Sequence, residues 1–464
     1  MPDASKTPGS PIDYDASLVD AVKSLSGAIF ALVHEARKNG SLALHPRTYI
    51  LRPNFSFLYT VDPTVMNFGS EYLVEETLEF NKLSEFVEGK VRGLNEFQVV
   101  RSIVSSTPRG DLLLSSFAFA VTGASVSAAD LGALKKYVET LLGDLGNEVH
   151  PCKAKVWLTG LTLGSDCIIV SDSLLLRHPR RGDLQEKVAE ESAHYAHALQ
   201  PTVHFSCIAD LRLPALYPMQ RQDAVEKLVL ALRLFRLGAI ASSMYAFDTD
   251  SLDPMASVAI GGPGRSGRES YELTLADAPN LAKFLEAVVP LLPASFAYPS
   301  PKRDYISTGF YWYGEAFFAP VPLEGSVASS IACLEALFLE SVQTEMSFRL
   351  GVRVAGFLRC FGLSALDVQA MVKQAYDVRS KYVHGDEQDK KWSIEKLVNL
   401  SRSVAEYSRL ALLAFCQMKD IISRKDLLIL VDNSLLNDES RIELDSLCSR
   451  VDFCRSFVQP GSII

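Results

Sequence analysis

The sequence has few of the features that mark specialised classes of protein. Its eight cysteines include no C-x-x-C pair and lie mostly among apolar neighbours, a pattern typical of reduced core thiols rather than of a disulfide framework or a zinc site. Residues 1–11 contain no apolar signal core. No run of apolar residues approaches the ~18 needed to span a bilayer. We therefore expect a cytoplasmic protein with no membrane segment and no structural metal.

An excess of positive charge is also missing. Lys and Arg total 46 against 55 Asp and Glu, which gives a net charge of −9. This balance excludes a protein that coats nucleic acid over its whole surface, although it allows a local basic site. The glycine-rich stretch at 261–267 is followed by Arg268-Glu269 and lacks the Lys-Ser or Lys-Thr of a phosphate-binding loop. We expect no nucleotide or other cofactor.

What is present is ordinary core material in a long chain. The 464 residues are 48% hydrophobic and 22% charged, which predicts two or three globular domains. Apolar spacing predicts an N-terminal α+β region over residues 1–150, a β-rich central region with helices over 151–300, and a C-terminal all-helical region over 301–464. The overall class is α+β.

Individual elements follow from the same patterns. In the N-terminal region we expect helices at 18–32, 77–96 and 131–141, and strands at 49–60, 99–104 and 112–121. In the central region we expect a hairpin of strands 156–163 and 167–176, a strand at 204–213, a helix from Asp223 and a strand at 271–275. In the C-terminal region we expect helices near 305–318, 327–346, 348–361, 365–384 and 393–418, with Ser364 and Ser393 as N-caps of the last two.

The expected helix at 365–384 carries the most informative pair of residues. Its apolar stripe, Val368, Val372 and Ala375, reaches position 379, where the sequence has an arginine. Five residues of α-helix turn through ~500°, so Arg379 and His384 would point ~140° apart. They could converge if the helix loosened before Gly385, or if two copies of the chain pooled their side chains. The plain alternative is a basic last turn before a C-terminal glycine.

Four sequence elements around this pair occur in a recognisable order. The segment resembles the Apea-like branch of the HEPN superfamily, whose helical bundles carry an Arg-x(4–6)-His motif. The resemblance covers residues 303–450. Its elements are Phe310-Tyr-Trp-Tyr313, Leu334-Glu-Ala-Leu337, Phe348-Arg-Leu-x-x-Arg353 and Tyr376-x-x-Arg379-Ser-Lys-x-x-His384-Gly385.

The resemblance implies a metal-independent endoribonuclease that works as a homodimer or a higher even oligomer, in defence against phage or in toxin-like growth arrest. By matching position, Arg379 and His384 are the catalytic pair. Ser380 stands where many HEPN domains have Asn, Asp or His. Supporting residues would be Ser380, Lys381, Tyr382 and Glu335, a carboxylate within an apolar run that needs a cationic partner such as Arg379.

The chemistry agrees with these residue types. Cleavage through the 2′-hydroxyl needs a base that titrates near neutrality, which histidine supplies, and a cation for the phosphorane charge, which Arg379 supplies. Residues 346–383 hold six basic against two acidic side chains, a local net charge of +4. We expect Arg349, Arg353 and Lys373 to contact RNA, with tRNA among the candidate substrates. Residues 1–300 would sense a phage or cellular trigger.

Two other functions remain open from the sequence. The helical region could be a non-catalytic RNA-binding or dimerisation module that keeps the same residues. The central region could instead hold a metal at Glu191, His194 and His197, although their spacing does not match the H-E-x-x-H arrangement of zinc enzymes.

Overall fold

Contacts within the computed structural model divide the chain into two compact units, which are described separately. The first comprises Met1–Ala154, Arg212–Pro218 and Ala246–Ala259, and the second Lys155–Leu211, Met219–Tyr245 and Ile260–Ile464. The structure describes residues 16–42, 45–51, 71–77, 80–107, 110–127, 134–146, 151–180, 183, 206–214, 218–248, 251–252, 260–261, 270–293, 304–317, 322–340, 346–387 and 392–451.

The first unit is built mainly from helices. Val22, Leu25, Ile29 and Val33 recur at helical spacing and are fully buried on α1, which packs against α3, α4 and α5. A separate antiparallel pair of strands lies in the same part of the chain. The elements are α1 (Ala16–Lys38), β1 (His45–Leu51), β2 (Glu71–Thr77), α2 (Phe80–Phe86), the π-helical turn η1 (Val87–Val91), α3 (Asn95–Val104), α4 (Gly110–Ser127) and α5 (Leu134–Leu145).

Two strands expected in this region are wrong. Residues 99–104 belong to α3 and residues 112–121 to α4. Short apolar runs do not distinguish a strand from a buried helix by composition, and here the buried positions settle the period. Phe97, Val100 and Val104 are buried at helical spacing on α3. The gap between the two expected strands contains the start of α4.

By length and composition, α1 is apolar enough to cross a membrane, with a mean hydropathy of 1.6 over its most apolar window. This run differs from the expectation that no apolar stretch is long enough to span a bilayer. A buried core helix of a soluble protein and a signal sequence near the N-terminus pass the same test. The window is 28% buried, and its buried stripe lies in the hydrophobic core of the first unit. A cytoplasmic location stays a prediction.

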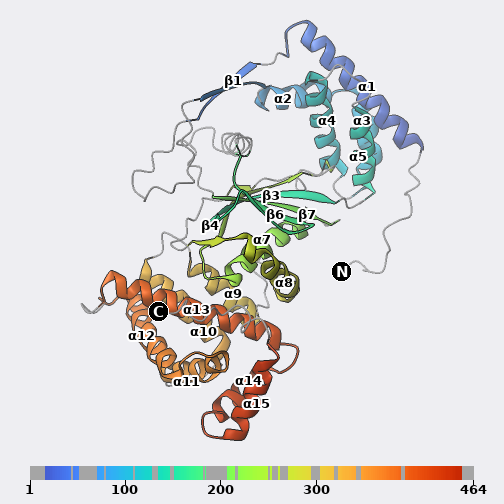
Figure 1. Cartoon of the computed structure of the whole chain (residues 1–464). Coiled ribbons are helices and arrows are strands. Elements are labelled where there is room, and N and C mark those ends of the chain that lie inside the picture. The colour runs from blue at the N-terminus through green and yellow to red at the C-terminus, as the bar shows by residue number, and fades with distance from the viewer. Residues whose placement is uncertain are drawn as a thin grey trace. The chain divides into compact units, whose positions relative to one another are not determined.

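Most of a six-stranded sheet with strand order β5-β6-β7-β3-β8-β9 lies in the second unit. Figure 1 labels its strands β3, β6 and β7. The pairs β5–β6, β6–β7 and β8–β9 are antiparallel. Trp157 on the interior strand β3 is fully buried, as expected for a strand with neighbours on both sides. The strands are β3 (Cys152–Thr159), β4 (Leu161–Leu163), β5 (Cys167–Ser171), β6 (Leu174–Arg177), β7 (Cys207–Leu213), β8 (Ala241–Asp248), β9 (Ile260–Gly261) and β10 (Tyr271–Leu273).

The expected hairpin of strands 156–163 and 167–176 is wrong. Gly160 has φ +76° and ends β3, and a Cβ there would lie 2.4 Å from the carbonyl oxygen of Ala239. The chain after Gly160 leaves the large sheet, because β4 pairs in parallel with β10. The actual hairpin is β5–β6, which turns at residues 172–173. The hairpin turn therefore lies after β5, and not at the Gly-Ser-Asp sequence that precedes β5.

The C-terminal helices agree with the sequence, to within a few residues for most. Ser364 and Ser393 are N-caps, whose hydroxyls accept from the backbone N–H groups of Asp367 and Lys396. Helix α10 is buried along most of its length and packs against α9, α12 and α13. The remaining helices are α7 (Pro218–Phe235), α8 (Ala278–Val288), α9 (Tyr305–Glu315), α10 (Leu323–Phe338), α11 (Met346–Leu358), α12 (Ala365–His384), α13 (Ile394–Met418), α14 (Arg424–Asn433) and α15 (Asp438–Ser449), with short 3-10 turns η3 (Leu275–Asp277), η4 (Val289–Leu291) and η5 (Arg359–Phe361).

The end of α7 connects the sheet to the C-terminal helices. A helix leaves its last four carbonyls without intrahelical partners, and side chains satisfy all of them here. The hydroxyls of Tyr271 and Tyr313 donate to the carbonyls of Leu232 and Arg233 at 2.7 and 2.9 Å. Arg409 on α13 donates to the next two carbonyls, at 2.7 and 3.4 Å. The chain is thus α+β, with a small antiparallel sheet and a C-terminal helical region.

Candidate functional site

Helix α12 carries the residues that the sequence singled out. It is regular from Ala365 to His384, and its buried residues are Val368, Val372, Ala375 and Val378. The helix ends at Gly385, which has φ +77° and so takes the left-handed conformation that glycine adopts most easily. The helix does not loosen before this glycine, which removes one of the two ways in which Arg379 and His384 could converge.

Arg379 lies beside the buried stripe and reaches the neighbouring helix α10. Its Nη2 atom donates to Oε2 of Glu335 at 3.3 Å, which confirms the expected pairing of these two side chains. The guanidinium also lies over the ring of Tyr376, 5.6 Å from the ring centroid. The side chain of Arg379 is 25% exposed, so the cation is reachable from solvent.

The surroundings of Glu335 disfavour the charged form of its carboxyl group. Burial raises the pKa of its carboxyl group, and the nearby charge of Arg379 only partly opposes that effect. Its second oxygen, Oε1, is buried without a hydrogen-bond partner in the described structure. A buried oxygen left unpaired costs ~1–3 kcal/mol. Such an atom is uncommon in folded proteins and calls for an explanation.

His384 lies apart from Arg379 within one chain. It is the last residue of α12 and is exposed. Because the helix stays regular between the two, the ~140° separation expected from helix geometry holds. Ser380 and Lys381 are half-buried, and Tyr382 is exposed. One chain therefore carries the guanidinium and the imidazole on different sides of α12 and does not bring them to one point.

The expected basic cluster is smaller in the structure than in the sequence. Arg353 is 6% exposed and forms a two-armed pair with Asp432, at 2.8 and 2.6 Å. Its remaining arm donates to the carbonyl of Phe338 at the end of α10. We therefore assign Arg353 to the fold and withdraw it from the RNA-contacting set. Arg349 is half-buried and Lys373 is exposed, so both stay in that set.

The metal site considered for the central region falls on residues that the structure does not describe. Glu191, His194 and His197 lie outside the described residues, as does most of the glycine-rich loop at 261–267. Among the residues that are described, no group of three or more His, Cys, Asp or Glu side chains could hold a metal ion.

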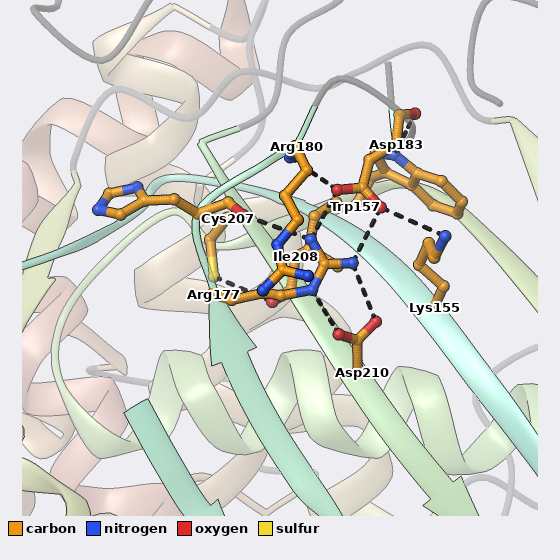
Figure 2. A network of polar contacts seen from close by, with 9 residues as sticks. Lys155, Trp157, Arg177, Arg180, Asp183, Cys207, Ile208 and Asp210 are labelled. Atoms are coloured by element: carbon orange, nitrogen blue, oxygen red, sulfur yellow. Dashed lines mark hydrogen bonds and ion pairs between the residues drawn. The ribbon is translucent and has the colours of Figure 1, made fainter. Parts of the chain in front are cut away.

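A polar network on the sheet was not anticipated from the sequence (Figure 2). Arg177, at the end of β6, donates two hydrogen bonds to Asp183, at 2.6 and 2.9 Å, and also binds Asp210 on β7. Lys155 lies 3.2 Å from Asp183, and the indole N–H of Trp157 donates to the Asp183 carbonyl. The available signal was a charge at the end of the apolar strand Leu174–Arg177.

The comparisons with known proteins give no relative for this chain. No family model, no curated protein and no solved structure matches it.

Proposed function

We propose that this protein is a metal-independent endoribonuclease in which Arg379 binds the scissile phosphate and His384 removes or relays the 2′-hydroxyl proton. The products would be a 2′,3′-cyclic phosphate and a 5′-hydroxyl. The observation that carries the proposal is the state of Arg379. This cation is partly exposed and makes one hydrogen bond to the described residues, whereas the buried Arg177, Arg353 and Arg409 of the same unit each donate from all three of their nitrogens.

We further propose that a homodimer completes the site, because one chain leaves the two residues on different sides of α12. The end of this helix, next to His384, and the start of α13 both expose apolar side chains, as an interface with a second copy would require. They are Tyr382 at 42%, Val383 at 56%, Ile394 at 77% and Val398 at 40% exposure.

Residues 1–300 would then sense a trigger and restrain the nuclease, because uncontrolled cleavage of cellular RNA would be lethal to the host. Defence against phage and toxin-like growth arrest are the settings in which such an effector would act. The proposal rests on the residues of α10 and α12 and on the resemblance of residues 303–450 to Apea-like HEPN domains.

The first test is cleavage of RNA, including tRNA, in excess chelator. We expect His384→Ala and Arg379→Ala each to lower the rate ~10²- to 10⁴-fold, since each removes a group that acts in the transition state. His34→Ala and Arg441→Ala change exposed residues of the same types and should leave the rate unchanged. New 5′ ends should accept a label from polynucleotide kinase without prior dephosphorylation. Cleavage by His384→Ala at the wild-type rate would refute the assignment.

The dimeric site has its own test, by mixing two inactive variants. In a heterodimer of Arg379→Ala with His384→Ala, one of the two shared sites keeps both residues. Random exchange should therefore restore about a quarter of the wild-type activity. No recovery after demonstrated subunit exchange, or a strictly monomeric mass at micromolar concentration, would contradict the shared site.

A second candidate function is a non-catalytic RNA-binding or dimerisation module. The separation of Arg379 and His384 within one chain favours it, since each residue alone can bind RNA or end a helix. Expression tests discriminate between the two proposals. A chain that is harmless at high level, with or without His384, would favour the binding module.

A further inference from the structure

The Arg379 guanidinium is held from two directions by two different kinds of contact. Glu335 on α10 accepts a hydrogen bond at its edge, at 3.3 Å. Tyr376, one turn earlier on α12, places its ring against the guanidinium at 5.6 Å. Tyr376 is half-buried, and its contact involves the ring face rather than the hydroxyl.

We propose that Tyr376 and Glu335 are positioning residues that orient the Arg379 guanidinium toward an RNA phosphate. This inference rests on the proposed ribonuclease function and adds Tyr376 to its site. Neither residue needs to touch the substrate, because both act through Arg379.

The geometry of the contacts supports this role. An arginine presents five N–H donors in a planar fork that matches a phosphate in a two-armed arrangement. Glu335 occupies one of these donors through a single long bond, and the ring of Tyr376 occupies none. Among the described residues this guanidinium has no other hydrogen-bond acceptor, so a phosphate could still take two parallel hydrogen bonds from it.

Saturated arginines elsewhere in the unit show what a purely structural pairing looks like. Arg409 is 2% exposed. Its Nε and Nη2 atoms donate to Glu406, and its Nη1 atom donates to a carbonyl at the end of α7. A two-armed pair of that kind at Arg379 would occupy the fork and neutralise its charge. The single bond to Glu335 instead limits the rotamers of a flexible side chain while leaving donors available, which is the requirement for preorganised phosphate binding.

Substitutions at Tyr376 separate the ring from the hydroxyl. Tyr376→Phe keeps the ring and should cleave RNA within about 2-fold of the wild-type kcat. Tyr376→Leu keeps much of the apolar volume but loses the ring face, and its kcat should fall about 3- to 30-fold with little change in KM. Glu335→Gln, which keeps the shape but loses the charge, should lower kcat about 10-fold. Equal cleavage by Tyr376→Leu and Tyr376→Phe would overturn the proposal.

A double variant tests whether these residues act through Arg379. Adding Tyr376→Leu or Glu335→Gln to Arg379→Ala should cause no further loss, because the group that they position is already gone. A double variant well below Arg379→Ala would show an independent, general structural effect and would overturn the proposal. Thermal unfolding of each variant checks that the fold is retained.

A readout without RNA keeps this inference distinct from the proposed function. In the full chain labelled with ¹⁵N-arginine, the side-chain signal of Arg379 is identified by its loss in Arg379→Lys. Tyr376→Leu and Glu335→Gln should each make that signal sharper and faster in exchange, whereas Tyr376→Phe should not. If wild type cleaves no RNA, the proposed function fails, and this signal alone decides the positioning role. An unchanged signal overturns that role whether or not RNA is cut.

Discussion

Two arginines on the same structural unit are held in opposite ways. The side chain of Arg177 on the sheet is 8% exposed and contacts two carboxylates and a backbone carbonyl (Figure 2). The side chain of Arg379 on α12 is 25% exposed and, among the described residues, makes one hydrogen bond, to a carboxylate whose other oxygen has no partner there. The first arrangement satisfies almost every donor and acceptor within the protein. The second leaves capacity for a ligand.

This contrast separates a charge that holds the fold from a charge that we propose binds a ligand. A buried ion pair tolerates no unsatisfied group unless something else offsets the cost. The Arg177 network meets that condition by itself, so it needs no ligand to explain it. The pair of Arg379 and Glu335 does not meet that condition. We interpret the unused N–H donors of Arg379 as the binding site for a phosphate.

The largest expected effect is the loss of the Arg177 network. Arg177→Ala leaves Asp183 buried without its main cationic partner and should lower the free energy of unfolding by ~3–5 kcal/mol. Arg379→Ala should cost less than ~1 kcal/mol, because its pair is single-armed and partly exposed. Urea unfolding followed by tryptophan fluorescence measures both, since Trp157 is buried beside the network. Arg441→Ala, at an exposed pair, serves as the control.

If the two variants lost equal stability, the distinction between the two arginines would not hold. A larger loss for Arg379→Ala would make its pair a structural one and would weaken the proposed site. A small loss for Arg177→Ala would mean that the sheet tolerates a buried unpaired carboxylate.

The sequence predicted the helical region better than the sheet, for a physical reason. Ser364, the buried stripe and Gly385 all lie within one helix, so local spacing defines α12 from end to end. The strand pairing depends on distant segments, as when β3 takes its place between β7 and β8. Nothing near Gly160 in the sequence indicates that its neighbour would be Ala239.

The same limit applies to the candidate site, where contacts that depend on distant segments could not be predicted from the sequence. The sequence predicts the pairing of Arg379 with Glu335, because each is a charged residue on an apolar helix face. Arg353 was misassigned for lack of a long-range contact, since its partner Asp432 lies 79 residues away. The ring contact of Tyr376 also escaped prediction, although the i, i+3 spacing to Arg379 was a usable signal.

Acid provides the second test of the comparison. Burial alone would raise the pKa of Asp183, but hydrogen bonds from Arg177 and from the backbone of Arg180 lower it to about 2, from an ordinary value of 3.8. A lowered pKa contributes stability that is present above the unfolded value and is lost as the pH falls toward the folded one. This carboxylate should contribute ~2 kcal/mol at pH 7, lost between about pH 5 and pH 2.

Unfolding of wild type and Asp183→Asn across this range measures that contribution. The stability difference between the two should shrink as the pH falls from about 4 toward 2, since the unfolded chain then takes up a proton on Asp183 that the folded protein takes up only near pH 2. A difference that stays constant from about pH 5 down to pH 2 would show that folding does not lower the pKa of Asp183.

Glu335 gives the smallest effect, and its sign is opposite. Because burial raises the pKa of this carboxyl, its contribution to stability is fully present below the unfolded value of about 4.5 and falls as the pH rises through the folded one. Glu335→Gln should therefore be neutral or stabilising by less than ~1 kcal/mol at pH 7, while Asp183→Asn is destabilising. Thermal unfolding at pH 4 and pH 7 measures both signs.

A stable but slow Glu335→Gln variant would match a carboxylate retained for activity at some expense to the fold. Clear destabilisation at pH 7 would instead place Glu335 with Asp183, as one half of a structural ion pair. Arg177 and Arg379 would then both belong to structural ion pairs. The unpaired oxygen of Glu335 would no longer indicate a ligand site at Arg379.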